Sequence, residues 1–116
     1  YHALLEPLEA KGYLRRPIVA QGCEHNAHMY YVLVAEDINR QAVLDEFRRN
    51  SIASVFHYVP LHSSPAGQRY GRAHGDLRAT NVASERLIRL PLWVGLTDQQ
   101  QDRVVETLDN ALRAQR

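Results

Sequence analysis

The chain has 116 residues and a formal net charge of +1, from 14 basic and 13 acidic side chains that are spread without blocks. This length is enough for one domain with one core, and the balanced charge predicts neither a nucleic-acid surface nor an acidic tail. The single cysteine, Cys23, excludes an internal disulfide, and without a signal peptide or an apolar run of about 18 residues the sequence predicts a cytoplasmic protein that does not enter membranes.

The first part of the sequence predicts a helix and then a strand. An apolar stripe over residues 3–8 has helical spacing and stops at Gly12, the residue type that commonly follows a helix end. The run Ala27–Val34 is too uniformly apolar for clean alternation and too short for a long helix, so it predicts a central strand. Because the sequence opens at Tyr1 inside a helical pattern, without an initiator methionine, we expect residues 1–116 to be one domain of a longer protein.

A second helix is predicted after this strand. Asp37 or Asn39 can cap it, the helix runs to about Arg49, and Asn50 suits a left-handed end. The residues expected to face the core are Val43, Leu44 and Phe47.

The stretch Ser51–His62 combines a short strand pattern with a rigid turn. Alternation places His57 on one face of the strand and Tyr58 on the other, and Pro60 ends the pairing because it has no N–H donor. We therefore expect His57, Tyr58 and His62 to lie close together where the chain leaves the sheet. A lone histidine on a strand is commonly a structural hydrogen-bonding residue, so a structural role and a binding role for His57 both stay open.

The last part of the sequence predicts a long loop over residues 63–79, followed by a helix, a strand and a helix. Thr80 or Asn81 can cap a short helix that runs to Leu87 and Ile88, and the strand over residues 89–94 carries a proline that favours a sheet edge. The capping box and the apolar spacing that predict the final helix belong to Thr97, Gln100, Val104, Val105, Leu108, Ala111 and Leu112.

This order of elements predicts a small α+β domain. Helix, strand, helix, strand, loop, helix, strand and helix follow one another without an internal repeat, an order that fits a two-layer sandwich. We expect a largely antiparallel sheet that helices cover on one face.

Two groups of polar residues permit more than one interpretation. Cys23, His25 and His28 are metal-ligand types, and the histidines that can complete a zinc shell with them are His57, His62 and His74. The spacing matches no paired ligand signature, so ordinary polar residues at the entry of a strand are the alternative.

The second group lies in the 63–79 loop. Arg69, Arg72 and Arg78 alternate with glycines, an arrangement in which guanidinium groups and backbone N–H groups can hold a phosphate. No Walker pattern is present, so a solvated loop is the alternative.

Three runs of the sequence resemble one known family. The runs are His25–Tyr31 (HNAHMYY), Val55–Gly67 (VFHYVPLHSSPAG) and Ser84–Leu92 (SERLIRLPL). Together they resemble the C-terminal domain of the nucleotide-sugar aminotransferases of the DegT/DnrJ/EryC1/StrS family, and the resemblance covers essentially the whole chain.

The resemblance implies a function for the intact protein. Members of this family are fold-type I pyridoxal-phosphate (PLP) enzymes, homodimers in which a large N-terminal domain holds the cofactor and the small C-terminal domain closes over the sugar. The implied reaction moves an amino group from L-glutamate to C4 of dTDP-4-keto-6-deoxyglucose, for cell-surface polysaccharide such as enterobacterial common antigen. The match places His57, Tyr58 and His62 at the sugar-facing wall and assigns no catalytic, cofactor-binding or metal residue to this chain. Asn26 and His28 also match the family pattern, but the match assigns them no catalytic role.

A complete PLP enzyme of this kind contains a lysine that binds the cofactor, and the sequence shows no such lysine motif in this domain. PLP enzymes need a lysine for covalent attachment and proton transfer, and the only lysine here is Lys11, directly before a predicted helix end. We therefore expect the isolated chain to be inactive. A free-standing α+β module that binds a small metabolite or has a regulatory role is the alternative.

Overall fold

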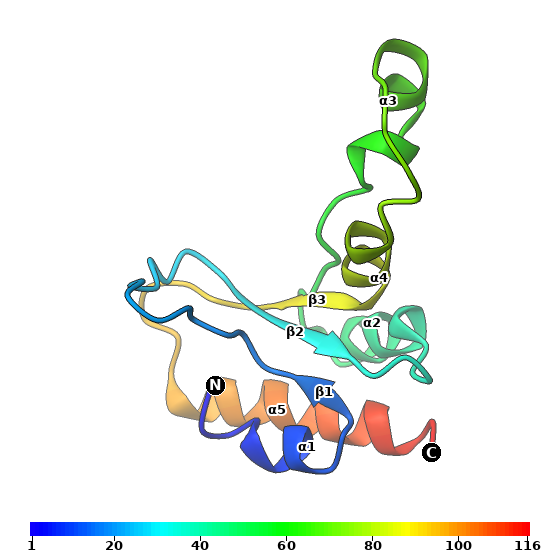
Figure 1. The fold of residues 1–116 in the computed structure, drawn as a ribbon. Helices are drawn as coiled ribbons and strands as arrows, with labels where there is room; N and C mark the ends of the chain where they lie inside the picture. Colours follow the sequence, from blue (N-terminus) through cyan, green and yellow to red (C-terminus); the bar gives the residue numbers. More distant parts are fainter.

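A three-stranded antiparallel sheet in the order β1-β2-β3 forms the centre of the fold. The computed structural model describes all 116 residues (Figure 1). In chain order the elements are α1 (Glu6–Ala10), β1 (Leu14–Arg15), β2 (Tyr30–Val34), α2 (Arg40–Arg49), the 3-10 turn η1 (Leu61–Ser63), α3 (Pro65–Tyr70), α4 (Arg78–Arg86), β3 (Leu87–Leu90) and α5 (Asp98–Arg113). The predicted α+β class, the antiparallel sheet and the central position of the strand predicted over Ala27–Val34 are confirmed, but the strand begins only at Tyr30, because Ala27 has a left-handed φ of 52° and residues 27–29 belong to the preceding loop.

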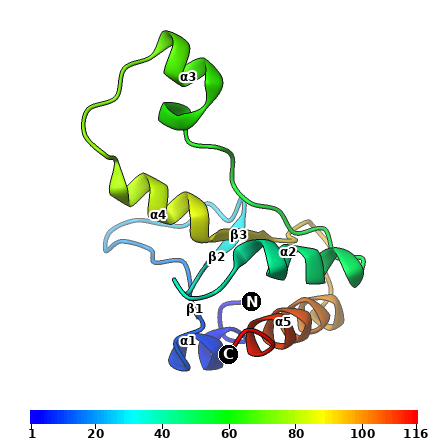
Figure 2. The ribbon, with the colours of Figure 1, turned by 90° about the vertical axis from the view of Figure 1, so that its right-hand side faces the viewer.

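The strand register explains which side chains enter the core. Leu14 on β1 pairs with Val34, and Tyr30 at the other end of β2 pairs with Leu90 on β3. Val32 and Val34 are fully buried, and as residues two apart on a strand they share one face of the sheet. Figures 1 and 2 show α1, α2 and α5 on one side of the sheet and α4 on the other, so the expectation that helices cover only one face was wrong.

The hydrophobic core lies between the sheet and helices α1, α2 and α5. Its sixteen residues are Leu5, Leu8, Leu14, Val32, Val34, Ile38, Val43, Leu44, Phe47, Ile52, Ile88, Leu90, Val104, Leu108, Ala111 and Leu112. The predicted inward residues of both long helices are among them, apart from Val105, which is partly buried against the cluster. This core is built entirely from the chain's own elements.

Local capping chemistry begins the two long helices where the sequence predicts. Asn39 Oδ1 accepts hydrogen bonds from the N–H groups of Gln41 and Ala42, at 2.9 and 3.2 Å. The capping box of α5 is present: Thr97 Oγ1 accepts from Gln100 N–H at 3.2 Å, and Gln100 Oε1 accepts from Thr97 N–H at 2.9 Å.

Two other helix-end predictions have different outcomes. Gly12 follows the first helix with φ of 73°, as expected. The left-handed residue after α2 is Ser51, with φ of 57°, and not Asn50, whose φ is −89°; the prediction for Asn50 was wrong by one position.

The predicted strand within Ser51–His62 does not form. Only Val55 pairs, through an isolated bridge to Arg89 in which the two N–H···O distances are 2.8 and 3.4 Å. Ser51 and Tyr58 have left-handed backbones, which interrupt an extended run on either side of this bridge. Val55 and Phe56, in residues 51–60 that we call the connector, remain half exposed, although Arg40 of α2 lies over the Phe56 ring at 5.3 Å. Neither face of the alternating pattern over residues 53–58 is therefore buried in the fold.

The predicted loop over residues 63–79 contains a helix, α3. Ser64 caps it by accepting a hydrogen bond from Gly67 N–H at 3.0 Å, and Pro65 occupies its first turn. Helix α4 begins earlier than expected, at Arg78, after Leu77 and not after a Thr80 or Asn81 cap. It ends at Arg86, so Leu87 and Ile88 belong to β3, the edge strand that the sequence places over residues 89–94.

Residues 61–77, which we call the arm, project away from the rest of the chain. Figures 1 and 2 show η1 and α3 standing off the sheet beyond α4, and none of the arm residues is buried. The radius of gyration is 15.5 Å, whereas a compact domain of this length has about 13 Å. The arm thus exposes most of its surface.

None of the helices combines the length and the apolar character that a membrane span requires.

Candidate functional site

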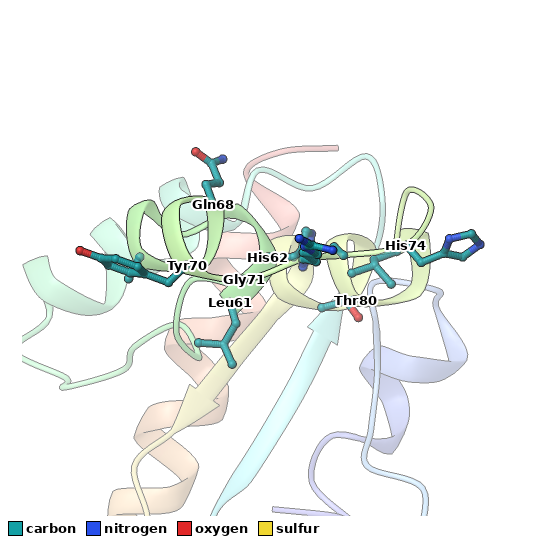
Figure 3. A pocket seen from close by; sticks show the side chains of 12 residues that line it. Leu61, His62, Gln68, Tyr70, Gly71, His74 and Thr80 are labelled. Atoms are coloured by element: carbon teal, nitrogen blue, oxygen red, sulfur yellow. The ribbon is translucent and has the colours of Figure 1, made fainter.

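His57, Tyr58 and His62, the candidate site residues from the sequence, lie at the base of the arm and line two adjoining cavities. His57 and Tyr58 line a cavity of about 560 Å³ between the connector and α4, here called the base cavity. His62 lines a cavity of about 1170 Å³ inside the arm, the arm cavity (Figure 3). Leu61 and Thr80 line both cavities, so the two spaces meet at these side chains.

His57 has a buried ring nitrogen without a partner. Its ring stands edge-on to Tyr58, with 5.1 Å between the ring centroids and 67° between the planes. Nδ1 of His57 and the hydroxyl oxygen of Ser54 are the buried side-chain polar atoms that make no hydrogen bond. A buried polar atom without a partner costs free energy, and functional sites are one place where proteins retain such atoms.

Tyr58 owes its position to an unusual backbone. Its φ of 48° is left-handed, a region that residues with a bulky side chain enter only at a cost. The turn directs the ring outward, and 74% of the residue is exposed. The left-handed backbone at Tyr58 replaces the regular alternation expected from the sequence, and it brings His57 and Tyr58 to the same cavity.

His62 is held by a residue from α4. Its Nε2 lies 2.8 Å from Oδ1 of Asn81, and Nδ2 of Asn81 donates to the backbone carbonyl of Asp76 at 2.7 Å. Sequence reasoning considered Asn81 only as a helix cap and missed this contact. No local signal predicts it, because the pair is separated by 19 residues.

Gly67 joins η1 to α3 at very close range. A Cβ atom built on Gly67 would lie 1.5 Å from the carbonyl oxygen of Leu61, so no other residue type fits without backbone movement. This junction sets the direction of α3 and therefore one wall of the arm cavity.

The arm carries more positive than negative charge, but its arginines do not converge on a phosphate site. Arg72 lines the arm cavity, whereas Arg69 lies over the ring of Tyr70 at 5.1 Å and Arg78 lines a different surface. The only acidic residue of the arm is Asp76. The geometry therefore gives no support to a three-arginine phosphate site.

The zinc hypothesis also has no geometric support. No three His, Cys, Asp or Glu side chains lie together in an arrangement that could hold a metal ion. Cys23, His25 and His28 are exposed in the loop before β2, where His25 Nδ1 accepts from Ala27 N–H at 2.9 Å and His28 Nδ1 lies 2.6 Å from Asn26 Oδ1. These contacts are local and hold a turn.

The residues present do not form a PLP site. Lys11, the only lysine, follows α1 and lies beside the acidic residues Asp102, Glu106 and Asp109. Helix α1 and the arm are at opposite ends of the view in Figure 1, so Lys11 serves neither cavity.

Comparison with known proteins identifies the family. The profile of the DegT/DnrJ/EryC1/StrS aminotransferase family matches residues 1–109. A "pleiotropic regulatory protein" of Geobacillus stearothermophilus is 33% identical over 110 residues, which are 93% of this chain and 28% of the relative. The dTDP-3-amino-3,4,6-trideoxy-alpha-D-glucose transaminase of Micromonospora megalomicea subsp. nigra is 28% identical over 97 residues, 82% of this chain and 25% of that enzyme.

A solved structure has a similar fold. The crystal structure of NtdA from Bacillus subtilis, with bound cofactor PMP, superimposes with a TM-score of 0.78 at 24% identity, covering 97% of this chain and 26% of NtdA. The chain thus spans little more than a quarter of the length of the relatives it matches. The profile match over nearly every residue shows that the chain belongs to the DegT/DnrJ/EryC1/StrS aminotransferase family.

Proposed function

We propose that this chain is the C-terminal small domain of a longer, cytoplasmic PLP-dependent nucleotide-sugar aminotransferase. The reaction we propose for the whole protein transfers an amino group from L-glutamate to C4 of dTDP-4-keto-6-deoxyglucose, giving dTDP-4-amino-4,6-dideoxygalactose for cell-surface polysaccharide. Family membership and the dTDP-amino-sugar relative support the substrate class. The C4 position, the glutamate donor and a homodimeric assembly follow from the resemblance of the HYVPLH and LPL runs alone.

The observation that carries this proposal is the apolar surface of the connector and the arm. Seven large side chains there are at least one third exposed: Val55, Phe56, Tyr58, Val59, Leu61, Tyr70 and Leu77. Monomeric soluble proteins rarely leave so many neighbouring apolar side chains in water, and such surfaces mark contacts with another domain or a ligand. The chain covers only about a quarter of these relatives' length, and we infer that a domain in the remainder of the protein covers this surface.

In the proposed enzyme this chain binds and orients the sugar. PLP, when held by the rest of the protein, supplies the electron sink that amino transfer requires. His57 and Tyr58 of the connector line the base cavity together with Ala83 of α4 and Leu87 of β3. The His57 ring lines the base cavity and makes no hydrogen bond within the protein, and Nε2, which is not among the buried atoms, is the nitrogen we expect to form a hydrogen bond with the sugar or its diphosphate.

Replacing His57 in the full-length enzyme tests this role. We expect His57→Ala to lower kcat/KM for dTDP-4-keto-6-deoxyglucose by roughly ten- to a hundredfold, the effect of losing a hydrogen bond of about 1.5–3 kcal/mol to a charged or strongly polar group. The absorption of bound PLP should stay the same. His25→Ala is the matched control, because His25 lies in the loop before β2 and contacts only its own turn.

The kinetic result decides between the two roles of His57. Unchanged kinetics in a His57→Ala variant that melts at the wild-type temperature would make His57 a structural residue. A drop that His25→Ala reproduces would point to a general effect of losing a histidine.

A free-standing regulatory module is the second candidate, which the regulatory name of the Geobacillus stearothermophilus relative favours. The two candidates differ in what the gene encodes around these residues. A reading frame that extends a few hundred residues upstream and includes a PLP-binding lysine supports the enzyme. An isolated 116-residue product that binds a metabolite supports the module.

A further inference from the structure

The orientation of the Asn81 amide follows from the atoms around it. The Asp76 carbonyl oxygen, 2.7 Å away, has only lone pairs and accepts hydrogen bonds, so the group of Asn81 that faces it must be the NH₂. The amide oxygen then faces the opposite way, toward His62 Nε2 at 2.8 Å. A flipped amide would place two acceptors against each other at Asp76.

The fixed amide determines which nitrogen of His62 carries the proton. Because Asn81 Oδ1 is an acceptor, His62 Nε2 must be the donor. In a neutral imidazole only one nitrogen is protonated, so Nδ1 of His62 carries the lone pair. Nδ1 makes no hydrogen bond within the protein, and unlike His57 Nδ1 it is not sealed from the surface.

His62 therefore presents an acceptor to the arm cavity. The ring lies among the residues that line the cavity, between α3 and the start of α4 (Figure 3). A neutral Nδ1 can accept a hydrogen bond from a hydroxyl or amino group and repels the lone pairs of a phosphate oxygen. At His62, the arm cavity therefore suits a ligand group that donates a hydrogen bond.

We propose that Asn81 is a positioning residue that holds His62 with its Nδ1 lone pair available to a hydroxyl group of the substrate. The identity of that group as a sugar hydroxyl rests on the proposed function, whereas the orientation of His62 does not. Asn81 itself touches His62 and Asp76, and it is not among the residues lining either cavity.

Ring-nitrogen NMR of the ¹⁵N-labelled 116-residue chain tests the orientation. At about pH 8.5, where an ordinary imidazole is neutral, we expect a protonated Nε2 and an unprotonated Nδ1 in His62. In Asn81→Leu, exchange of the Nε2–H proton with water should become roughly tenfold faster, because its acceptor is gone. Asn81→Asp keeps an oxygen acceptor and should retain slow exchange.

Asn110→Leu is the matched control for this measurement. Asn110 is an exposed asparagine on α5, and its replacement should leave the His62 signals unchanged. A proton on Nδ1 of neutral His62 in the wild-type chain, or equal Nε2–H exchange in wild type and Asn81→Leu, overturns the proposal.

Steady-state kinetics of the full-length enzyme test the contact with substrate. Asn81→Leu should raise KM for the nucleotide sugar about five- to tenfold with little change in kcat, and Asn81→Asp should recover part of this loss. Unchanged KM in Asn81→Leu, in an enzyme that turns over the sugar, overturns the hydroxyl contact. If the enzyme has no activity on any nucleotide sugar, the proposed function fails, and the NMR result alone then decides the role of Asn81.

Discussion

Gly67 is the residue whose replacement the structure tolerates least in the arm. Its missing side chain allows α3 to begin directly against the carbonyl group of Leu61. The same turn is held by the Ser64 cap, whose hydroxyl also donates to the Leu61 carbonyl at 2.9 Å. A single small residue thus sets the geometry of the arm cavity.

We expect Gly67→Ala to disrupt the arm and leave the core intact. The added methyl group would overlap the Leu61 carbonyl oxygen, so η1 and α3 must separate. Hydrogen exchange followed by mass spectrometry should show faster exchange over residues 61–71 and unchanged protection in β2 and α5. Ala66→Ser, at the neighbouring exposed position, is the control. Wild-type exchange in the arm of Gly67→Ala would disprove the close packing.

Two tyrosines make stability depend on high pH. Burial raises the pKa of the Tyr1 and Tyr30 hydroxyl groups to about 12, from an ordinary value near 10. The Tyr1 hydroxyl donates to the Pro91 carbonyl at 2.9 Å, and the Tyr30 hydroxyl lies 3.1 Å from His2 Nδ1. Because the folded state holds these protons more tightly than the unfolded state, their contribution to stability is complete below pH 10.

We therefore expect the free energy of unfolding to fall as the pH rises from about 10 to about 12. Urea titrations at several pH values measure it. The double variant Tyr1→Phe/Tyr30→Phe should show a flatter decline, whereas Tyr70→Phe, on the exposed arm, should decline like wild type. Parallel curves for wild type and the double variant would show that other groups cause the loss.

At the scale of elements, α5 is the helix on which the core depends most. It contributes four members of the core cluster, Val104, Leu108, Ala111 and Leu112, and packs against α2 and its buried Phe47. Its start is fixed by the Thr97 capping box. The sheet itself has short strands, so the helices supply much of the buried apolar surface.

Removing the cap should lower the stability of the whole domain. We expect Thr97→Ala to reduce the free energy of unfolding by about 1 kcal/mol, because one backbone N–H loses its side-chain acceptor. Thermal unfolding should show this as a decrease of about 3–6 °C in Tm. Thr80→Ala is the control, since Thr80 is an exposed residue of α4. A Tm for Thr97→Ala equal to that of Thr80→Ala would show that the box does not limit stability.

At the scale of the whole molecule, the chain combines a buried hydrophobic core with an exposed arm. The core is sealed by the chain's own helices, while the connector and arm keep their apolar side chains in water. In the proposed enzyme another domain covers this surface. The isolated chain has no such cover.

The isolated chain should therefore associate as its concentration increases. Sedimentation velocity should show larger species at higher concentration, driven by burial of the arm's apolar side chains. Val59→Glu/Leu61→Glu should weaken association by introducing charges at two exposed apolar positions. Val94→Glu, in the loop after β3 and away from the arm, should not (Figure 1). A wild-type chain that stays monomeric at millimolar concentration would contradict the proposal that a domain covers the arm.

Features that depend on neighbours within a few residues could be predicted from the amino-acid sequence. The caps at Asn39 and Thr97 and the helical spacing of α2 and α5 follow from local hydrogen bonding and from the 3.6-residue period. The central strand followed from a continuous apolar run that only a buried position accommodates. The family followed from short runs of specific residues, which the profile match supports.

Features that depend on contacts between residues distant in sequence could not be predicted and became visible only in the folded chain. The Ser51–His62 pattern looks like a strand, yet a strand forms only where a partner and a covering layer exist, and here Val55 alone finds one. The division of the predicted site into two cavities, and the pairing of His62 with Asn81, arise because α4 packs beside the connector. Local sequence carries no record of such packing, since its free energy comes from side chains that meet only in the folded chain.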